Sequence, residues 1–262
     1  MATLAAQALN RARALARVPV TARPPFAPER CAARCGVITI RRTALHGGIA
    51  RIDPAPHSAS AGGSPRWILS VDGRMPPHTP QWNGAVAAAL ARALVPAALS
   101  GAAADRLAEA AAAEILLPMR PFRVAATRTD LTMDGLRDLA VRFSAPIRLT
   151  VRQWLHSGTW RGYALLWRAE DGVPVLRWRA ASPAERFPKG AAIGAQAGAL
   201  FAEDSRLYET LRTGRPSHGV EEVRSGGAGR TWWFTRFGVV REDAGESTGR
   251  AVLALVILDR GP

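Results

Sequence analysis

The sequence predicts an α+β protein in which a helix-rich first part is followed by a smaller, strand-rich second part. Up to about residue 157 the chain consists mainly of helical segments separated by three short β-branched runs. Residues 158–262 instead contain mostly runs of the apolar and aromatic residues that form strands. The composition changes at Ser157-Gly158, which marks the boundary. With 262 residues and a hydrophobic fraction of 48%, the chain can form two cores of ordinary size.

Caps, prolines and apolar spacing predict the helices of the first part. Thr79-Pro80 is a typical N-cap followed by proline in the first turn, and Pro96 ends that helix. An alanine-rich helix ends in the same way at Pro118, and Gly36 stands where a left-handed C-cap belongs. We therefore expect helices over residues 2–16, 28–35, 80–95, 102–117, 131–143 and 148–155.

Strands are predicted from β-branched and aromatic runs bounded by turn residues. The clearest run is Val37-Ile-Thr-Ile40, and the turn dipeptide Asp72-Gly73 closes a second one. We expect strands over residues 37–41, 49–52, 67–71, 163–168, 173–178, 232–240 and 251–258. One helix, over residues 198–211, is expected among the strands of the second part.

The chain carries a formal net charge of +14, from 35 basic and 21 acidic residues. Lys189 is the single lysine, and alanine is abundant. This composition is typical of a GC-rich genome, because Arg and Ala have GC-rich codons. The arginines are also spread along the chain. Either genome composition or a functional basic surface therefore explains the charge.

No apolar run reaches the roughly 18–20 residues that a membrane span requires. The arginine-containing first 16 residues lack the continuous apolar block and the cleavage site of a secretory signal. We therefore expect a cytoplasmic protein with no membrane partner. Cys31 and Cys35 are interpreted as small buried residues of a reduced protein, because one cysteine pair cannot complete a four-ligand zinc site.

Three segments, taken in order, carry a family resemblance. They are Arg34-Cys-Gly-Val-Ile-Thr-Ile40 with Gly47-Gly48-Ile49, Ala110-Ala-Ala-Ala-Glu-Ile-Leu-Leu-Pro118, and Leu136-Arg-Asp-Leu-Ala-Val-Arg-Phe-Ser-Ala-Pro146. In type and spacing they are similar to the opening helix and strands, the Glu-Leu-Leu-Met-Pro helix end and the Leu-x-x-Leu-Ala-x-x-Phe block of the ImmA/IrrE zinc metallopeptidases. The resemblance covers about residues 10–155. It implies a zincin-like minimal peptidase domain over residues 1–120 and a helix-turn-helix-like region over residues 121–157.

Active members of this family carry His-Glu-x-x-His on the helix after the third strand, so that two histidines bind zinc and the glutamate polarises a water molecule. The matching positions here are Val86, Ala87 and Leu90, and the position of the third ligand, on the next helix, is Leu107. None of these side chains binds metal ions. The resemblance therefore implies an inactive peptidase whose former metal cavity has become core. No cofactor is predicted, although active relatives bind zinc.

Three functions stay open at this point. The first is an inactive ImmA/IrrE-like regulatory module that binds a protein partner, such as a helix-turn-helix repressor of the kind that active relatives cut. The second is an active zinc metallopeptidase that cleaves a repressor with unrecognised ligands, such as His46, His57 or His78. The third is a DNA-binding transcriptional regulator that uses the residue 136–155 helices. Its nucleic-acid contacts would be Arg137, Arg142, Arg148 and Arg152.

Residues 158–262 are compatible, in the order and size of their elements, with a reduced form of the GAF-like sensor domain that follows the peptidase domain in IrrE-type members. The strands carry aromatic side chains that form either a core or a ligand pocket. The candidate pocket residues are Tyr163, Trp167, Trp178 and Trp233.

Overall fold

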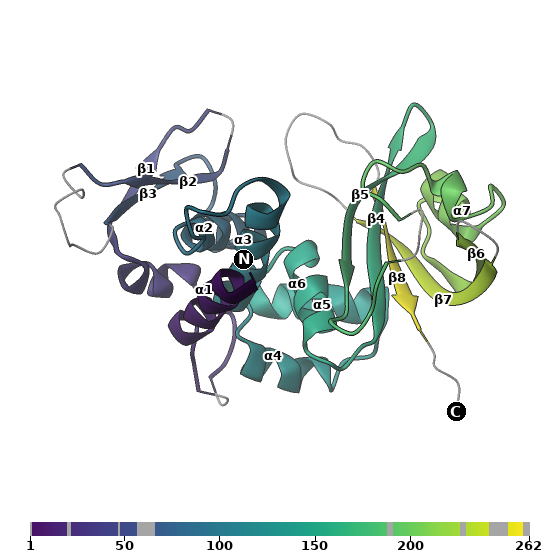
Figure 1. Ribbon diagram of the computed structural model, residues 1–262, viewed down its shortest axis with the longest axis horizontal. Helices are drawn as coiled ribbons and strands as arrows, with labels where there is room; N and C mark the ends of the chain where they lie inside the picture. Colours follow the sequence, from purple (N-terminus) through teal and green to yellow (C-terminus); the bar gives the residue numbers. More distant parts are fainter. Residues whose placement is uncertain are drawn as a thin grey trace. The chain divides into compact units, whose positions relative to one another are not determined.

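The structure, a computed structural model, is described for residues 2–19, 22–46, 48–56, 66–187, 191–225, 229–240 and 251–258. Helices and two β-sheets make up this part of the chain, so the predicted α+β class is confirmed (Figure 1). Contacts divide the chain into a first unit, Met1–Thr129 with Leu136–Gln153, and a second unit, Asp130–Gly135 with Trp154–Pro262. No helix within the described ranges is long and apolar enough to cross a membrane.

The first unit contains a three-stranded sheet of order β1-β3-β2. Its strands are β1 (Val37–Thr43), β2 (Ala50–Pro54) and β3 (Trp67–Asp72), close to the predicted bounds. β1 runs parallel to the central strand β3, and β2 runs antiparallel to it. Leu69 and Val71 of β3 are fully buried, because alternate residues of a strand share one face and helices cover this one.

Three helices of the same unit pack on this sheet or on one another. α2 (Pro80–Arg92) packs against β2, β3 and α3 (Gly101–Leu116), and α1 (Ala2–Leu15) packs on α3. The predicted N-cap of α2 is confirmed, because Thr79 Oγ1 accepts a hydrogen bond of 3.2 Å from the Trp82 amide. The continuous helix expected over residues 28–35 is wrong. Two 3₁₀ turns take its place (Pro28–Cys31 and Ala33–Cys35).

Three further helices follow α3. They are α4 (Met119–Ala126), α5 (Met133–Phe143) and α6 (Ile147–His156). α5 and α6 confirm the predicted helix pair. α5 begins later than expected because Thr132 Oγ1 accepts a hydrogen bond of 3.0 Å from the Gly135 amide, as an N-cap does. α4 was not expected.

The second unit is built on a five-stranded antiparallel sheet of order β5-β4-β8-β7-β6. The strands are β4 (Gly162–Glu170), β5 (Val173–Ala181), β6 (Ser217–Ser225), β7 (Gly229–Val240) and β8 (Ala251–Ile257). β6 was not predicted, because glycine and two adjacent glutamates interrupt its apolar alternation. Met133 belongs to this unit because it lies on the sheet: a Cβ atom added to Gly238 would be 2.7 Å from its Cε.

The helix expected over residues 198–211 is wrong in its first half. A 3₁₀ turn (Ala197–Ala199) and a separate helix α7 (Arg206–Thr213) occupy this region. Ser205 has an extended backbone at the N-cap of α7, so a new helix begins after it. Gly214, with φ of 71°, ends α7 in the left-handed conformation.

Candidate functional site

The helix that resembles the zinc-binding helix of active peptidases contributes to the core of the first unit. Val86, Ala87 and Leu90 lie on α2 and are fully buried. Their hydrocarbon side chains have no lone pair to offer a metal ion. The three α2 positions matched by the resemblance are therefore core positions that offer no metal ligand.

Leu107 does not join these three residues. It is 8% exposed on α3 and packs in a separate small cluster with Ala8 of α1 and Leu99. The interpretation that the four matched positions surround one former metal cavity therefore needs correction. α1 lies against this part of α3, and its small residues bring Leu107 into contact with α1.

The surroundings of α2 do not fit a zinc ion. Within the described residues, no group of three or more His, Cys, Asp or Glu side chains could hold a metal. His46 and His78 lie in loops, and His57 lies outside the described residues. Burial raises the pKa of the Cys35 thiol to about 11, which disfavours the thiolate that binds metals.

Polar and small residues of α2 instead hold the turn between α5 and α6. Asn83 is buried, and its Nδ2 donates a hydrogen bond of 2.9 Å to the main-chain oxygen of Ser144. The neighbouring Gly84 lies against Pro146, because a Cβ atom at position 84 would be 2.4 Å from the proline Cγ. The first turns of α2 are therefore built to dock this turn.

Two of the four arginines predicted to contact nucleic acid are engaged with α3. Arg152 Nη1 lies 2.7 Å from Glu109 Oε2, and Arg148 Nη2 lies 3.9 Å from Glu109 Oε1. The Arg152 side chain is only 15% exposed. Arg137 is partly buried on α5, and Arg142, at the end of α5, is exposed. Arg148 and Arg152 thus hold α6 to α3.

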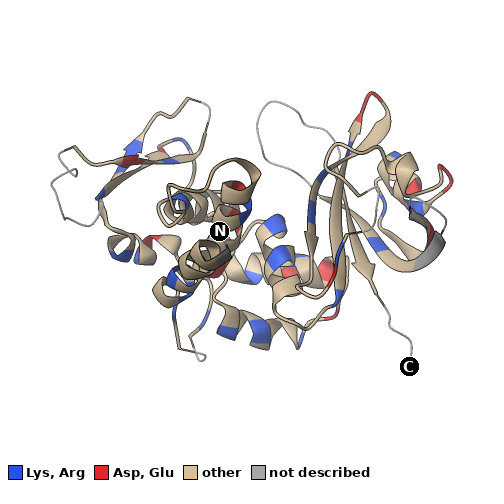
Figure 2. Ribbon diagram, viewed as in Figure 1, with Lys and Arg blue, Asp and Glu red and all other residues tan. Residues whose placement is uncertain are grey.

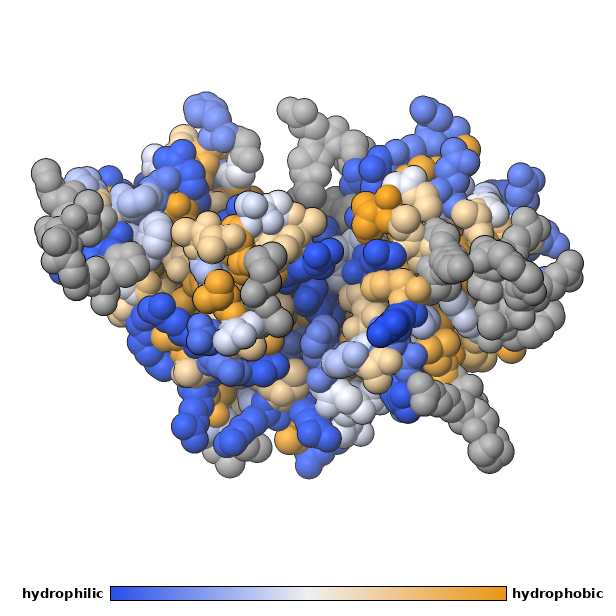
Figure 3. Space-filling model, in the orientation of Figure 1, coloured by the Kyte–Doolittle hydropathy of each residue, from blue (hydrophilic) through white to orange (hydrophobic). Residues whose placement is uncertain are grey.

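A second group of arginines lies on α4 and just after it. Arg120, Arg123 and Arg128 are exposed, and their side chains form no ion pair within the described part of the chain. Figure 2 shows basic positions on α4, and the surface over α1 and α4 is largely hydrophilic in Figure 3. α4 was not predicted, although Phe122 and Ala126 have the spacing of a buried helical face.

The aromatic residues proposed for a ligand pocket are divided between the two faces of the second sheet. Tyr163, Trp167 and Trp233 lie in one core together with Phe201. Ring centroids are 5.6 Å apart for Tyr163 and Trp233, and 5.9 Å apart for Trp167 and Phe201. Trp178 pairs in register with Leu166, on the other face. Protein side chains therefore occupy the space that the pocket interpretation reserved for a ligand.

A hollow of about 600 Å³ lies elsewhere in the second unit, between the β4–β5 turn and α7. Three carboxylates and one arginine face it, so its lining is acidic. Burial, with a smaller effect of Glu203, raises the pKa of Tyr208 at its wall. The lining residues are Ala169, Gly172, Pro174, Glu203, Asp204, Ser205, Tyr208, Glu209, Leu211 and Arg212.

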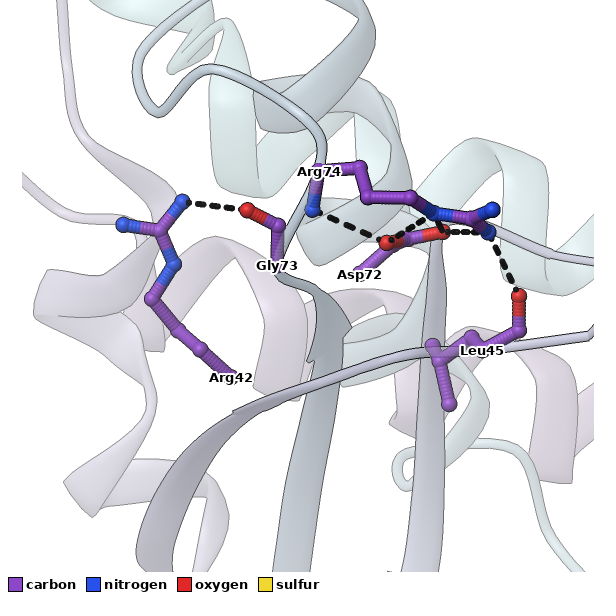
Figure 4. Close-up of polar contacts among 5 residues, drawn as sticks. All are labelled: Arg42, Leu45, Asp72, Gly73 and Arg74. Carbon is purple, nitrogen blue, oxygen red and sulfur yellow. Dashed lines mark hydrogen bonds and ion pairs between the residues drawn. The ribbon is translucent and has the colours of Figure 1, made fainter.

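A charged cluster fixes the end of the first sheet (Figure 4). Arg74 Nη2 lies 2.7 Å from Asp72 Oδ2 and also donates a hydrogen bond of 3.0 Å to the main-chain oxygen of Leu45. Hydrogen bonds from the Arg74 side chain, and then from its backbone amide, lower the pKa of Asp72 to about 2. Arg42 Nη2 donates to the main-chain oxygen of Gly73 at 3.2 Å. The cluster therefore joins β1, the loop after it and the end of β3.

Comparison with known proteins adds one finding about the fold. No protein-family model matches this sequence, and no curated protein matches it. Among solved structures, the chain is similar to a Mycobacterium tuberculosis transcriptional regulator, with a TM-score of 0.58 and 17% sequence identity. The match covers 97% of this chain and 76% of the other. At this identity the likeness concerns the fold.

Proposed function

We propose that this chain is an ImmA/IrrE-like regulatory protein that does not cleave peptides and acts by binding a protein partner. The observation that carries the proposal is the complete burial of Val86, Ala87 and Leu90 on α2. A hydrolytic zinc site needs histidine or carboxylate ligands and an open position for water, and these residues supply neither.

The regulatory part of the proposal is supported by the fold, which is shared over nearly the whole chain with a protein named as a transcriptional regulator. The partner would be a helix-turn-helix repressor, bound without being cut. The second unit would then act as a small sensor-like domain, with the acidic hollow beside α7 as the place for a ligand. We place the ligand in this hollow and not among the aromatic residues around Tyr163, because protein side chains fill that space.

Zinc-dependent proteolysis is the activity to exclude. The purified full chain is incubated with an unfolded protein substrate, with and without added zinc, and the products are analysed by mass spectrometry. The proposal predicts intact substrate in both samples. Zinc-dependent fragments that disappear on addition of a chelator would overturn it.

DNA binding is a second candidate, favoured by the exposed arginines of α4 rather than by Arg148 and Arg152. The test is fluorescence anisotropy with duplex DNA at several salt concentrations. If Arg120 and Arg123 contact phosphates, the double variant with Arg120→Ala and Arg123→Ala lowers the slope of log K against log salt by about 0.9 per lost contact. Arg106→Ala, on α3, is the matched control. A slope that is unchanged in the double variant would remove this candidate.

A further inference from the structure

Strand β1 is an outer strand of the first sheet and exposes two large apolar side chains. Within the described residues its only neighbouring strand is β3. Ile38 is 51% exposed and Ile40 is 44% exposed. An exposed, apolar outer strand offers both unpaired backbone groups and apolar side chains to another chain.

The exposure of both isoleucines follows from the packing of the sheet. Ile40 lies opposite Leu69, which is fully buried, so both residues belong to the helix-covered face. α2 packs over β2 and β3 and leaves β1 less covered. Ile38 falls where the pairing register with β3 shifts, between Val37 and Thr39. A shift of this kind turns a side chain away from its regular direction.

The far end of β1 is held in place. The Arg42 side chain donates to the main-chain oxygens of Gly73 and Met75, both at 3.2 Å, and its guanidinium lies 5.4 Å from the ring centroid of Trp82. These contacts tie the strand to the loop after β3 and to α2. An edge that is already ordered loses less entropy on binding than a flexible segment.

The charge around β1 indicates the chemistry of its partner. Residues 22–74 contain eight arginines and three acidic residues. Each of these acids is already engaged: Glu29 accepts from the Trp82 indole, Asp53 pairs with Arg51, and Asp72 pairs with Arg74. Arg41, in the middle of β1, is exposed. Acidic side chains on a partner would therefore find unneutralised arginines here.

We infer that an extended, acidic segment of a partner protein adds to the first sheet as a further strand along the outer side of β1. Main-chain hydrogen bonds would supply the pairing, the side chains of Ile38 and Ile40 an apolar contact, and Arg41 a charge contact. This inference rests on the proposed function in one respect, since it names the surface by which the protein partner is held.

The probe is a short fluorescent peptide in which Glu and Val alternate, and the readout is anisotropy with the full-length protein. Ile38→Ser and Arg41→Glu should each weaken binding by about tenfold, as loss of an apolar or a charge contact does. The matched control is Ile193→Ser, at an apolar side chain of the second unit that is 55% exposed. Alternate amides of β1 already pair with β3, so hydrogen exchange should show added protection at the outward-pointing β1 amides when the peptide is present.

The outcomes separate this inference from the proposed function. A bound, intact peptide with added protection of the outward-pointing β1 amides supports both. A bound peptide that is cut supports the docking strand and contradicts the absence of proteolysis. Absence of binding, equal binding of a Lys–Val peptide, or loss of affinity in Ile193→Ser as large as in Ile38→Ser overturns the inference and leaves the proposed function in place.

Discussion

The side-chain amide of Asn83, in the first turn of α2, donates a hydrogen bond of 2.9 Å to the main-chain oxygen of Ser144, in the turn between α5 and α6. This bond joins the helix that resembles a catalytic helix to the pair that resembles a DNA-binding motif. In this chain, both elements are thus used to build the first unit. The contact explains why a polar residue stands among the buried residues of α2.

Gly84→Ala tests the fit between α2 and the α5–α6 turn. In an exposed helix this change stabilises by about 1 kcal/mol. At position 84 the new Cβ would lie 2.4 Å from Pro146 Cγ. We therefore expect a net loss of up to about 2 kcal/mol in the free energy of unfolding, because overpacking costs about 1–3 kcal/mol and outweighs the gain in helix propensity. Urea denaturation measures it, and a more stable variant would show that the turn does not dock here.

Leu90→Ala tests the role of the matched ligand position as core. We expect a loss of about 2–5 kcal/mol in the free energy of unfolding, as for other fully buried leucines. The loss should be the same with and without a chelator. Leu4→Ala, at a residue that is 38% exposed on α1, is the control and should cost much less. A chelator-dependent difference would mean that a metal contributes to stability.

Arg152→Ala tests the assignment of this arginine to the α3–α6 contact. The substitution leaves the Glu109 carboxylate, which is 23% exposed, without its 2.7 Å partner. Removing one partner of a partly buried pair costs about 1–3 kcal/mol, whereas an exposed arginine such as Arg142 changes stability by at most about 0.5 kcal/mol. Thermal unfolding of Arg152→Ala and Arg142→Ala compares the two. Equal effects would contradict the assignment.

The cluster around Asp72 predicts a pH dependence of stability. Its pKa is lowered to about 2 in the folded protein, against about 3.9 in an unfolded chain. Because the folded value is the lower one, the stabilisation is present above about pH 4 and is lost as the pH falls from about 4 to 2. Asp72→Asn should therefore be less stable at pH 7, with a deficit that shrinks in this range. Urea denaturation at several pH values measures the free energies of unfolding, and Asp53→Asn, in an exposed pair, is the control. A deficit of Asp72→Asn that does not depend on pH would refute the prediction.

Sequence reasoning succeeded where the signal was local. The Thr79 cap, the β-branched run at Val37 and the paired helices after Met133 all depend on neighbouring residues, and the structure has them. β6 and α4 were missed because their signals are weak: glutamates interrupt the strand, and α4 has only eight residues. Elements of this kind are stabilised mainly by tertiary packing.

The candidate sites depended on contacts between distant residues, which the sequence pattern does not contain. Leu107 meets Ala8, 99 positions earlier, and Arg152 meets Glu109 across two helices. Only the register showed that Trp178 lies on the face opposite Trp167, outside the core that contains Tyr163, Trp167 and Trp233. A one-residue change in register moves a side chain to the other face, and sequence alone did not reveal the shift between Leu166 and Trp167.

We expect the first unit to fold and act without bound zinc, because core side chains occupy the matched ligand positions of α2. The most direct measurement is the metal content of the purified full chain by mass spectrometry, after dialysis against zinc and then against metal-free buffer. We expect a zinc-to-protein ratio near zero and an unchanged melting temperature. A ratio near one, with a melting temperature that falls on addition of a chelator, would contradict it.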